Sequence, residues 1–140
     1  MAQAPRAQYV TSVCTGALVL GAAGLLRGYR ATTHWLALDF LEPLGAILAR
    51  GERIVVDRNR ITGGGVTAGI DFALVLASKL RGETAAKQIQ LLIEYDPAPP
   101  FSAGSPRTAP PELVRAVTEQ RVATQEERRR IVEKIAGSAG

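Results

Sequence analysis

The sequence predicts an α/β domain with a parallel sheet and flanking helices. Short β-branched runs alternate with longer stretches in which apolar residues recur at helical spacing, a pattern typical of β-α-β units. Glycines or prolines separate most of these runs. The chain has 140 residues, of which 46% are hydrophobic and 21% are charged. This composition supplies enough apolar side chains for one packed core and excludes a disordered chain.

The first third of the chain predicts two strand–helix units. Residues 9–13 are short and β-branched, as in a buried strand. The stretch 17–26 is rich in Gly and Ala, so a helix there can lie close to a sheet, and Gly28 is expected to end it. The second unit has a strand over 30–33 and a helix over 34–44.

A β-hairpin is predicted near the middle of the chain. β-branched runs at 54–56 and 60–62 flank the turn sequence at 57–59, and a short strand at 46–49 precedes them. Because hairpin strands are antiparallel, this pair is expected to be an antiparallel excursion from the parallel sheet.

Three consecutive glycines, 63–65, join the hairpin to a helix predicted over 67–80. Their backbones can adopt left-handed conformations, and N–H groups at a helix start point toward whatever lies in front of them. A further helix is predicted over 83–94. Six of the eight prolines then fall in an extended loop at 95–111, before a last helix over 112–136.

Charge and cysteine content exclude several kinds of site. There are 17 Lys and Arg against 13 Asp and Glu, but only 3 Tyr, 3 Phe and 1 Trp, too few aromatics for a nucleic-acid stacking platform. The arginines at 128–130 lie among glutamates, which is typical of a solvated helix face. A single Cys forms neither an internal disulfide nor a Cys-rich zinc site, so we expect no metal.

The beginning of the chain has only the outline of a targeting segment. Arg6 precedes an apolar run at 13–26, but Thr and Gly dilute that run and no convincing cleavage site follows it. The run is also shorter than the roughly 20 apolar residues of a membrane-spanning helix. We therefore expect a cytoplasmic protein that binds neither membranes nor nucleic acid.

Cys14 lies where the first predicted strand turns sharply into the first helix. Such a turn lifts a nucleophile above the sheet and aims the following N–H groups at it, and the positive helix end favours the reactive thiolate. Gly16 is expected to keep the turn from clashing with the strand. The alternative is a structural cysteine, because free Cys packs as a small hydrophobe.

Three other side chains are weighed as partners of the cysteine. His34, the single histidine, could activate a thiol, but we favour a capping role at the start of its own helix. Thr15 offers a hydroxyl to a thiolate or a reacting group. Asp71 lies in the first turn of a helix, where an anion is stabilised, and is not chosen as a general acid.

Four stretches of the sequence resemble the DJ-1/PfpI superfamily. Residues 9–26 (YVTSVCTGALVLGAAGLL) carry the turn at the cysteine, and residues 30–35 (RATTHW) follow it. Within the superfamily, residues 62–73 (TGGGVTAGIDFA) and 94–106 (EYDPAPPFSAGSP) are similar to the isocyanide hydratases. These stretches are distributed over residues 9–106.

The resemblance implies a flavodoxin-like fold of the class I glutamine amidotransferase type, a homodimer, and an enzyme without a cofactor. The implied reaction adds water to an isocyanide and gives an N-substituted formamide through a covalent thioimidate on Cys14. Thr15 would polarise this adduct. The backbone at Gly64, Gly65 and Val66 would line the pocket together with Gly16. The signature includes His34 without making it a base.

The resemblance also implies a departure at the front of the chain. Family members have an N-terminal half with further strands and an acidic residue that assists the cysteine, whereas Asp39 is the first acid here. We therefore expect a partial domain over 1–140 whose nucleophile strand has a missing neighbour. Two rival functions remain: a DJ-1-like ligand sensor of AraC-type regulators, and a chaperone or deglycase. The first needs a helix-turn-helix module, and the second a Cys-His turn with an upstream Glu.

Overall fold

A three-stranded sheet forms the centre of the protein. The structure is a computed structural model that describes residues 3–138. β1 (Val10–Val13) runs parallel to β5 (Arg60–Gly63), which in turn pairs antiparallel with β4 (Ile54–Asp57). The β4–β5 hairpin and its antiparallel direction confirm the prediction. Within the described residues β1 pairs on one side only, so it forms an edge of this sheet.

A second, two-stranded parallel sheet lies beside the first and carries the core. It consists of β2 (Arg30–Ala31) and β3 (Ile47–Leu48). Helix α1 (Gly16–Ala22) and the 3₁₀ helix η2 (Trp35–Leu41) pack around it. The largest side chains of this core, Leu26 and Leu41, are completely buried. The observed sheets and helices confirm an α/β fold.

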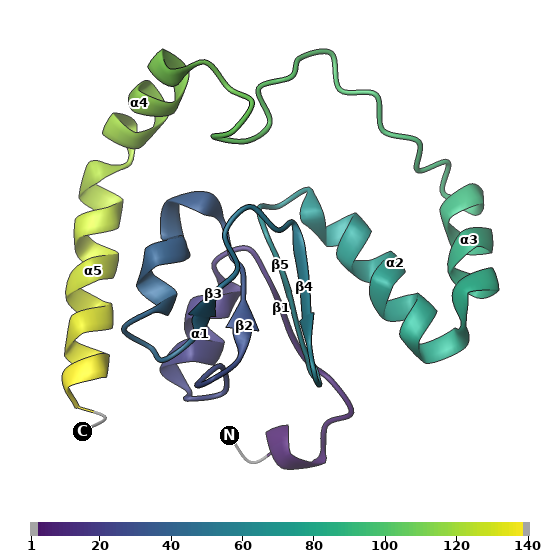
Figure 1. Ribbon diagram of the computed structural model, residues 1–140, viewed down its shortest axis with the longest axis horizontal. Helices are drawn as coiled ribbons and strands as arrows, with labels where there is room; N and C mark the ends of the chain where they lie inside the picture. The colour runs from purple at the N-terminus through teal and green to yellow at the C-terminus, as the bar shows by residue number, and fades with distance from the viewer. Residues whose placement is uncertain (1–2, 139–140) are drawn as a thin grey trace.

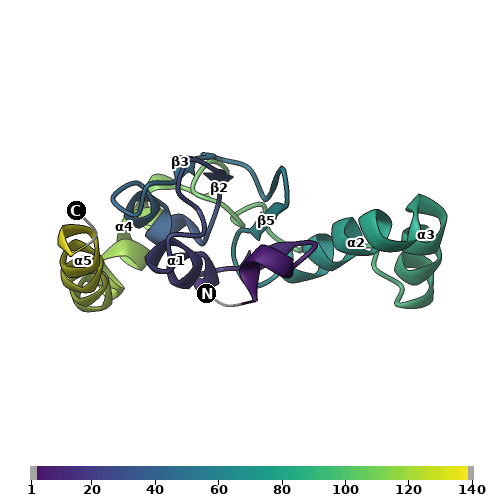
Figure 2. The same cartoon turned by 90° about the horizontal axis from the view of Figure 1, so that it is seen from below.

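The remaining helices extend away from the sheets on both sides (Figures 1 and 2). On one side, α2 (Ala68–Arg81) and α3 (Glu83–Leu92) form an arm that projects outward. From α3 the chain crosses to the opposite side and forms α4 (Pro111–Gln120) and α5 (Val122–Gly137). α5 packs back on the body of the protein, where Val132 joins Phe40 and Leu44 in a second core cluster. The short 3₁₀ helix η1 (Ala4–Arg6) precedes β1.

Two of the predicted helices differ from the structure near the front of the chain. The first ends at Ala22 instead of residue 26, because Gly24 has a φ of +71° and the Leu25 N–H bonds back to the Leu20 carbonyl. The helix predicted over 34–44 is instead a 3₁₀ helix. Within it Trp35, Leu38 and Leu41 recur every three positions, which is the 3₁₀ period, and Leu44 continues this spacing just after its end.

The last predicted helix is two helices in the structure. Arg121 separates α4 from α5 with φ −110° and ψ 4°, outside the helical range, and its N–H bonds to the Thr118 carbonyl. The break lets α4 and α5 take different directions, as Figure 1 shows. None of the helices within residues 3–138 is long and apolar enough to cross a membrane.

A close approach at Gly21 generates a stability prediction. A Cβ at this position would lie 2.8 Å from Cδ1 and 3.1 Å from Cβ of Leu44, which is itself buried. We expect Gly21→Ala to lower the free energy of unfolding by about 1–3 kcal/mol, because overpacking costs more than the helix gains from losing a glycine. Urea unfolding measures the change. The control is Gly137→Ala, whose Cβ would have no neighbour within 4 Å, and equal losses in the two variants would contradict this explanation.

Candidate functional site

Cys14 occupies a strained turn between β1 and α1. Its φ is +56°, a value that few non-glycine residues adopt. The Cys14 N–H donates to the carbonyl oxygens of Gly63 and Gly64, at 3.0 and 2.8 Å. The structure therefore has the sharp strand-to-helix turn that the sequence predicted, and the end of β5 holds it in place.

The Thr33 hydroxyl holds the same turn from the other side. It donates to the Cys14 carbonyl oxygen over 2.6 Å, and the Thr33 residue is only 3% exposed. A neighbouring bond runs from the Thr32 N–H to the Thr62 hydroxyl over 2.9 Å. Thr33 was not among the predicted site residues. The available signal was a pair of threonines directly after a strand, because buried hydroxyls need hydrogen-bond partners.

Thr15 and Gly16, the two residues after Cys14, were both predicted to serve the site. Thr15 stands at the N-cap of α1, yet its hydroxyl makes no capping hydrogen bond. The Thr15 hydroxyl therefore does not cap the backbone N–H groups of α1. A Cβ on Gly16 would meet the Ser12 Cβ at 3.5 Å, an ordinary contact. The expectation that glycine is sterically required at position 16 is therefore wrong.

The Gly-rich segment lies against the turn, but its three candidate residues face different partners. Gly64 accepts a bond from Cys14, while its own N–H is taken by the Arg53 carbonyl at 2.8 Å. A Cβ on Gly65 would lie 3.4 Å from Cδ2 of His34. Val66 is 79% exposed. Gly64 thus adjoins the cysteine through its carbonyl group and not through a free N–H.

His34 has the capping role that the sequence analysis favoured. Its Nδ1 accepts a hydrogen bond from the Leu36 N–H at 3.3 Å, at the start of η2. The ring stacks on Trp35 with centroids 5.9 Å apart. Partial burial, reinforced by the charges of Arg128 and Arg121, holds the pKa of His34 below its ordinary value of 6.5. The neutral ring is the form that can accept from Leu36.

The Asp71 carboxylate accepts hydrogen bonds from two other side chains. One carboxylate oxygen accepts from Arg53 Nε at 2.5 Å, and the other accepts from the Tyr95 hydroxyl at 3.0 Å. These bonds tie the start of α2 to the segment that follows α3. Among residues 3–138 no cluster of three or more His, Cys, Asp or Glu side chains is placed to hold a metal ion.

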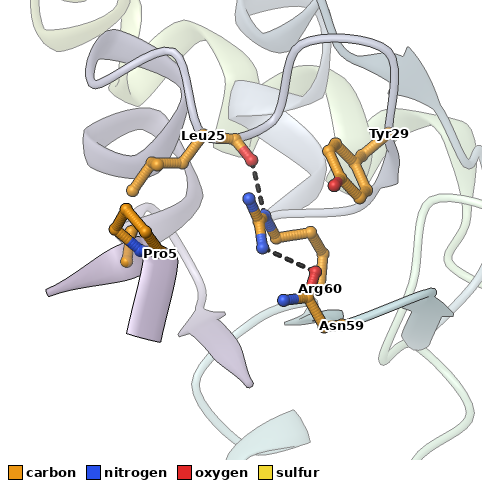
Figure 3. A pocket seen from close by; sticks show the side chains of 6 residues that line it. Pro5, Leu25, Tyr29, Asn59 and Arg60 are labelled. Atoms are coloured by element: carbon orange, nitrogen blue, oxygen red, sulfur yellow. Dashed lines mark hydrogen bonds between the residues drawn. The ribbon is translucent and has the colours of Figure 1, made fainter. Parts of the chain in front are cut away.

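A hollow of about 350 Å³ lies at the other end of the sheet (Figure 3). Arg60 reaches across it and donates to the Leu25 carbonyl at 2.7 Å and to Asn59 Oδ1 at 2.7 Å. Arg60 opens β5 and pairs in register with Val10, whereas Cys14 follows the end of β1. Val10, which pairs with Arg60, lies four residues before Cys14, and four residues of extended strand span about 13 Å. This hollow therefore does not belong to the cysteine turn.

Comparisons with known proteins agree on one family. The DJ-1/PfpI family profile matches residues 1–79. An isonitrile hydratase from Pseudomonas putida is 55% identical over 134 residues, which are 96% of this chain and 58% of that protein. The chain thus spans less than two thirds of that relative's length. The transcriptional regulator GbdR from Pseudomonas aeruginosa is 34% identical over 96 residues, 68% of this chain and 26% of the regulator.

Solved structures give the same result for the fold. A ThiJ/PfpI family protein from Pseudomonas syringae superposes with a TM-score of 0.85 at 50% identity, covering 94% of this chain and 52% of that one. Drosophila melanogaster DJ-1beta superposes with a TM-score of 0.60 at 20% identity, covering 66% of this chain and 50% of the other.

The Thr33 bond to the cysteine carbonyl generates a testable prediction. We expect Thr33→Val to lower the free energy of unfolding by about 1–3 kcal/mol, because the carbonyl of the strained Cys14 residue then keeps only the longer bond from the Ala17 N–H, at 3.3 Å. Thr33→Ser keeps the hydroxyl and should recover most of this loss. Urea unfolding gives the stabilities, and the alkylation rate of the single cysteine reports on the turn itself. A Thr33→Val protein as stable as the parent would contradict the role of this bond.

The environment of His34 predicts a titration that NMR can follow directly, because the chain has one histidine. We expect a pKa below 6.5, moving upward in Arg128→Ala as a repelling charge is removed. Since the unfolded chain binds this proton more readily, stability should fall as pH drops through 6.5 toward the lowered value. Arg130→Ala on the same helix is the control. A wild-type pKa at or above 6.5 would refute the prediction.

Proposed function

The chain belongs to the DJ-1/PfpI family, and on that premise we propose that it carries the chemistry of an isocyanide hydratase. The proposed reaction adds water to an isocyanide and yields an N-substituted formamide, with Cys14 as the nucleophile. The observation that carries the proposal is the strained turn at Cys14 in a chain 55% identical to an isonitrile hydratase. Backbone strain of this kind is often retained where it serves a function.

The proposed first step forms a carbon–sulfur bond. The Cys14 thiolate attacks the terminal carbon of R–N≡C, and that carbon takes up one proton, giving the thioimidate R–N=CH–S. The Thr15 hydroxyl, which caps nothing, would donate a hydrogen bond to the adduct nitrogen and stabilise the charge that develops there. The resemblance implies that a carboxylate from the N-terminal half of the family domain assists this proton transfer.

The second step releases the product. The oxygen of water adds to the thioimidate carbon, one water proton goes to the nitrogen, and the other is released, which returns the proton taken up in the first step. The carbon–sulfur bond breaks, so that R–NH–CHO leaves and the thiolate is restored. The overall reaction is R–NC plus one water giving R–NH–CHO. In this scheme His34 stays neutral and positions its helix, because its Nδ1 is already an acceptor for the Leu36 N–H.

A second candidate function rests on the similarity to GbdR, which covers 68% of this chain. In that case the domain would bind a ligand at the same turn without turning it over. We also propose a cytoplasmic homodimer that needs no cofactor, as the family resemblance implies. Light scattering on the purified chain tests the dimer, because a mass of one chain at all concentrations would reject it.

The test of the proposed reaction uses cyclohexyl isocyanide with the purified chain. We expect N-cyclohexylformamide by NMR, or a covalent adduct of one isocyanide on the protein by mass spectrometry. Both should disappear in Cys14→Ser, with product formation falling roughly 10³-fold or more, because the nucleophile is lost. Urea unfolding checks that this variant is folded.

Three outcomes would overturn parts of the proposal. Equal formamide production by Cys14→Ser would remove the cysteine from the mechanism. Saturable binding of the isocyanide without adduct or formamide would favour the ligand-sensing function. Fast turnover by the chain alone would show that it needs no carboxylate from elsewhere in the family domain.

A further inference from the structure

The hollow of about 350 Å³ at the far end of the sheet has a cationic side chain in its wall. We call it the Arg60 hollow. Figure 3 shows the Arg60 guanidinium in the middle, with Leu25 and Pro5 on one side and Tyr29 on the other. Ala4 and Asn59 complete the lining. Neither the sequence analysis nor the proposed reaction gives this hollow a role.

Arg60 keeps most of its hydrogen-bonding capacity unused. The side chain is half-buried, and its Nε donates to the Leu25 carbonyl and its Nη1 to Asn59 Oδ1, both at 2.7 Å. A guanidinium has five N–H donors, so these two bonds leave three, two of them on Nη2. Both acceptors are neutral, and none of the ion pairs within residues 3–138 includes Arg60. The hollow therefore presents a positive charge together with N–H donors.

The acid that stands opposite Arg60 in the β4–β5 hairpin is already occupied. Asp57 pairs in register with Arg60, but its Oδ1 accepts from Arg58 Nε at 3.0 Å and its Oδ2 from the Arg30 N–H at 2.8 Å. Arg58 balances the charge of Asp57 in this way, and the charge of Arg60 remains. One unmatched cation favours a monoanion, because a second negative charge would lose hydration without gaining a partner.

The other walls of the Arg60 hollow suit an apolar body. Pro5 and Leu25 are aliphatic, and Tyr29 adds an aromatic ring. The centre of that ring lies 4.5 Å from Arg60 Cζ and 3.5 Å from Arg58 Cζ. These cation–π contacts hold the guanidinium in place before a ligand arrives, so binding costs less conformational freedom. An apolar cavity of about 150 Å³ binds benzene, so about 350 Å³ accommodates a ring and a carboxylate group.

We propose that the Arg60 hollow binds a small organic monocarboxylate, with the carboxylate on Arg60 and the apolar body against Leu25 and Pro5. The planar guanidinium presents its donors on a rigid fork that matches the two oxygens of a carboxylate. The binding is reversible and no covalent bond changes. Because about 13 Å of strand separates the hollow from the cysteine turn, this inference goes beyond the proposed reaction and does not depend on it.

The probe is benzoate, titrated into the purified chain and followed by NMR at the Leu25 methyl groups. We expect saturable shifts with a dissociation constant of about 1 mM, which agrees with the affinity per non-hydrogen atom of small ligands. Benzamide has the same shape without the charge and should bind about tenfold more weakly. The methyl groups of Leu92, which is 84% exposed on α3 and outside the hollow, should not shift.

Two substitutions of Arg60 test the role of its charge and of its fork. Arg60→Gln removes the charge and should weaken benzoate binding about tenfold, with little effect on benzamide. Arg60→Lys keeps the charge but loses the fork, so its affinity should lie between those of the parent and Arg60→Gln. The matched control is Arg81→Gln, at an exposed residue that ends α2 and does not line the hollow. It lowers the net charge equally and should bind benzoate like the parent.

Three outcomes would overturn the proposal. The first is equal binding of benzoate and benzamide by the parent, since the charge then selects nothing. The second is unchanged benzoate binding in Arg60→Gln. The third is an equal loss in Arg60→Gln and Arg81→Gln, which would show attraction to net charge only. If Arg60→Gln does not fold, the comparison of benzoate with benzamide on the parent decides.

These measurements are separate from formamide production. Cys14→Ser should bind benzoate with the parent affinity, because the cysteine does not line the hollow. Loss of formamide without loss of benzoate binding would therefore count against the reaction alone, and loss of benzoate selectivity without loss of formamide would count against the hollow alone.

Discussion

The backbone of Cys14 is held from two sides, and the arrangement of the site depends on it. Its N–H bonds to the carbonyls of Gly63 and Gly64, and its own carbonyl accepts from the Thr33 hydroxyl. A residue in the left-handed region costs about 1–3 kcal/mol, and hydrogen bonds worth about 1 kcal/mol each offset that cost. The turn is therefore stable only when the end of β5 and the residues after β2 are both in place.

The same bonds place the other candidate residues. Because the Gly-rich segment is tied to Cys14, α2 begins next to the cysteine and carries its arm outward from there. Because Thr33 is tied to Cys14, His34 and Trp35 lie next to the turn, and η2 begins at that point. Trp35 also lines an apolar groove with Leu113, Val114 and Val117 of α4, which lie about eighty residues later in the chain.

Local sequence signals predicted the elements whose conformation is decided by neighbouring residues. The 54–62 hairpin has a two-residue turn with Arg58 at φ +53°, between β-branched strands. The predicted helix ends were wrong where a competing local hydrogen bond or packing against distant residues determined where the helix stops. Gly24 ended α1 four residues early, and no residue type marked the break at Arg121. The packing of Val132 against Phe40 and Leu44 fixes the direction of α5 and brings together residues about ninety positions apart.

By itself, the sequence determined the α/β class, the strand–turn–helix around Cys14 and the capping role of His34, because each depends on residues within a few positions. Only the tertiary structure decided that Thr33 holds the Cys14 carbonyl, that the Gly64 N–H is already taken, and that Trp35 shares a groove with α4. These contacts join segments 11 to about 80 residues apart. Their partners are selected by burial and by the need to satisfy buried polar groups, and local sequence patterns do not record that selection.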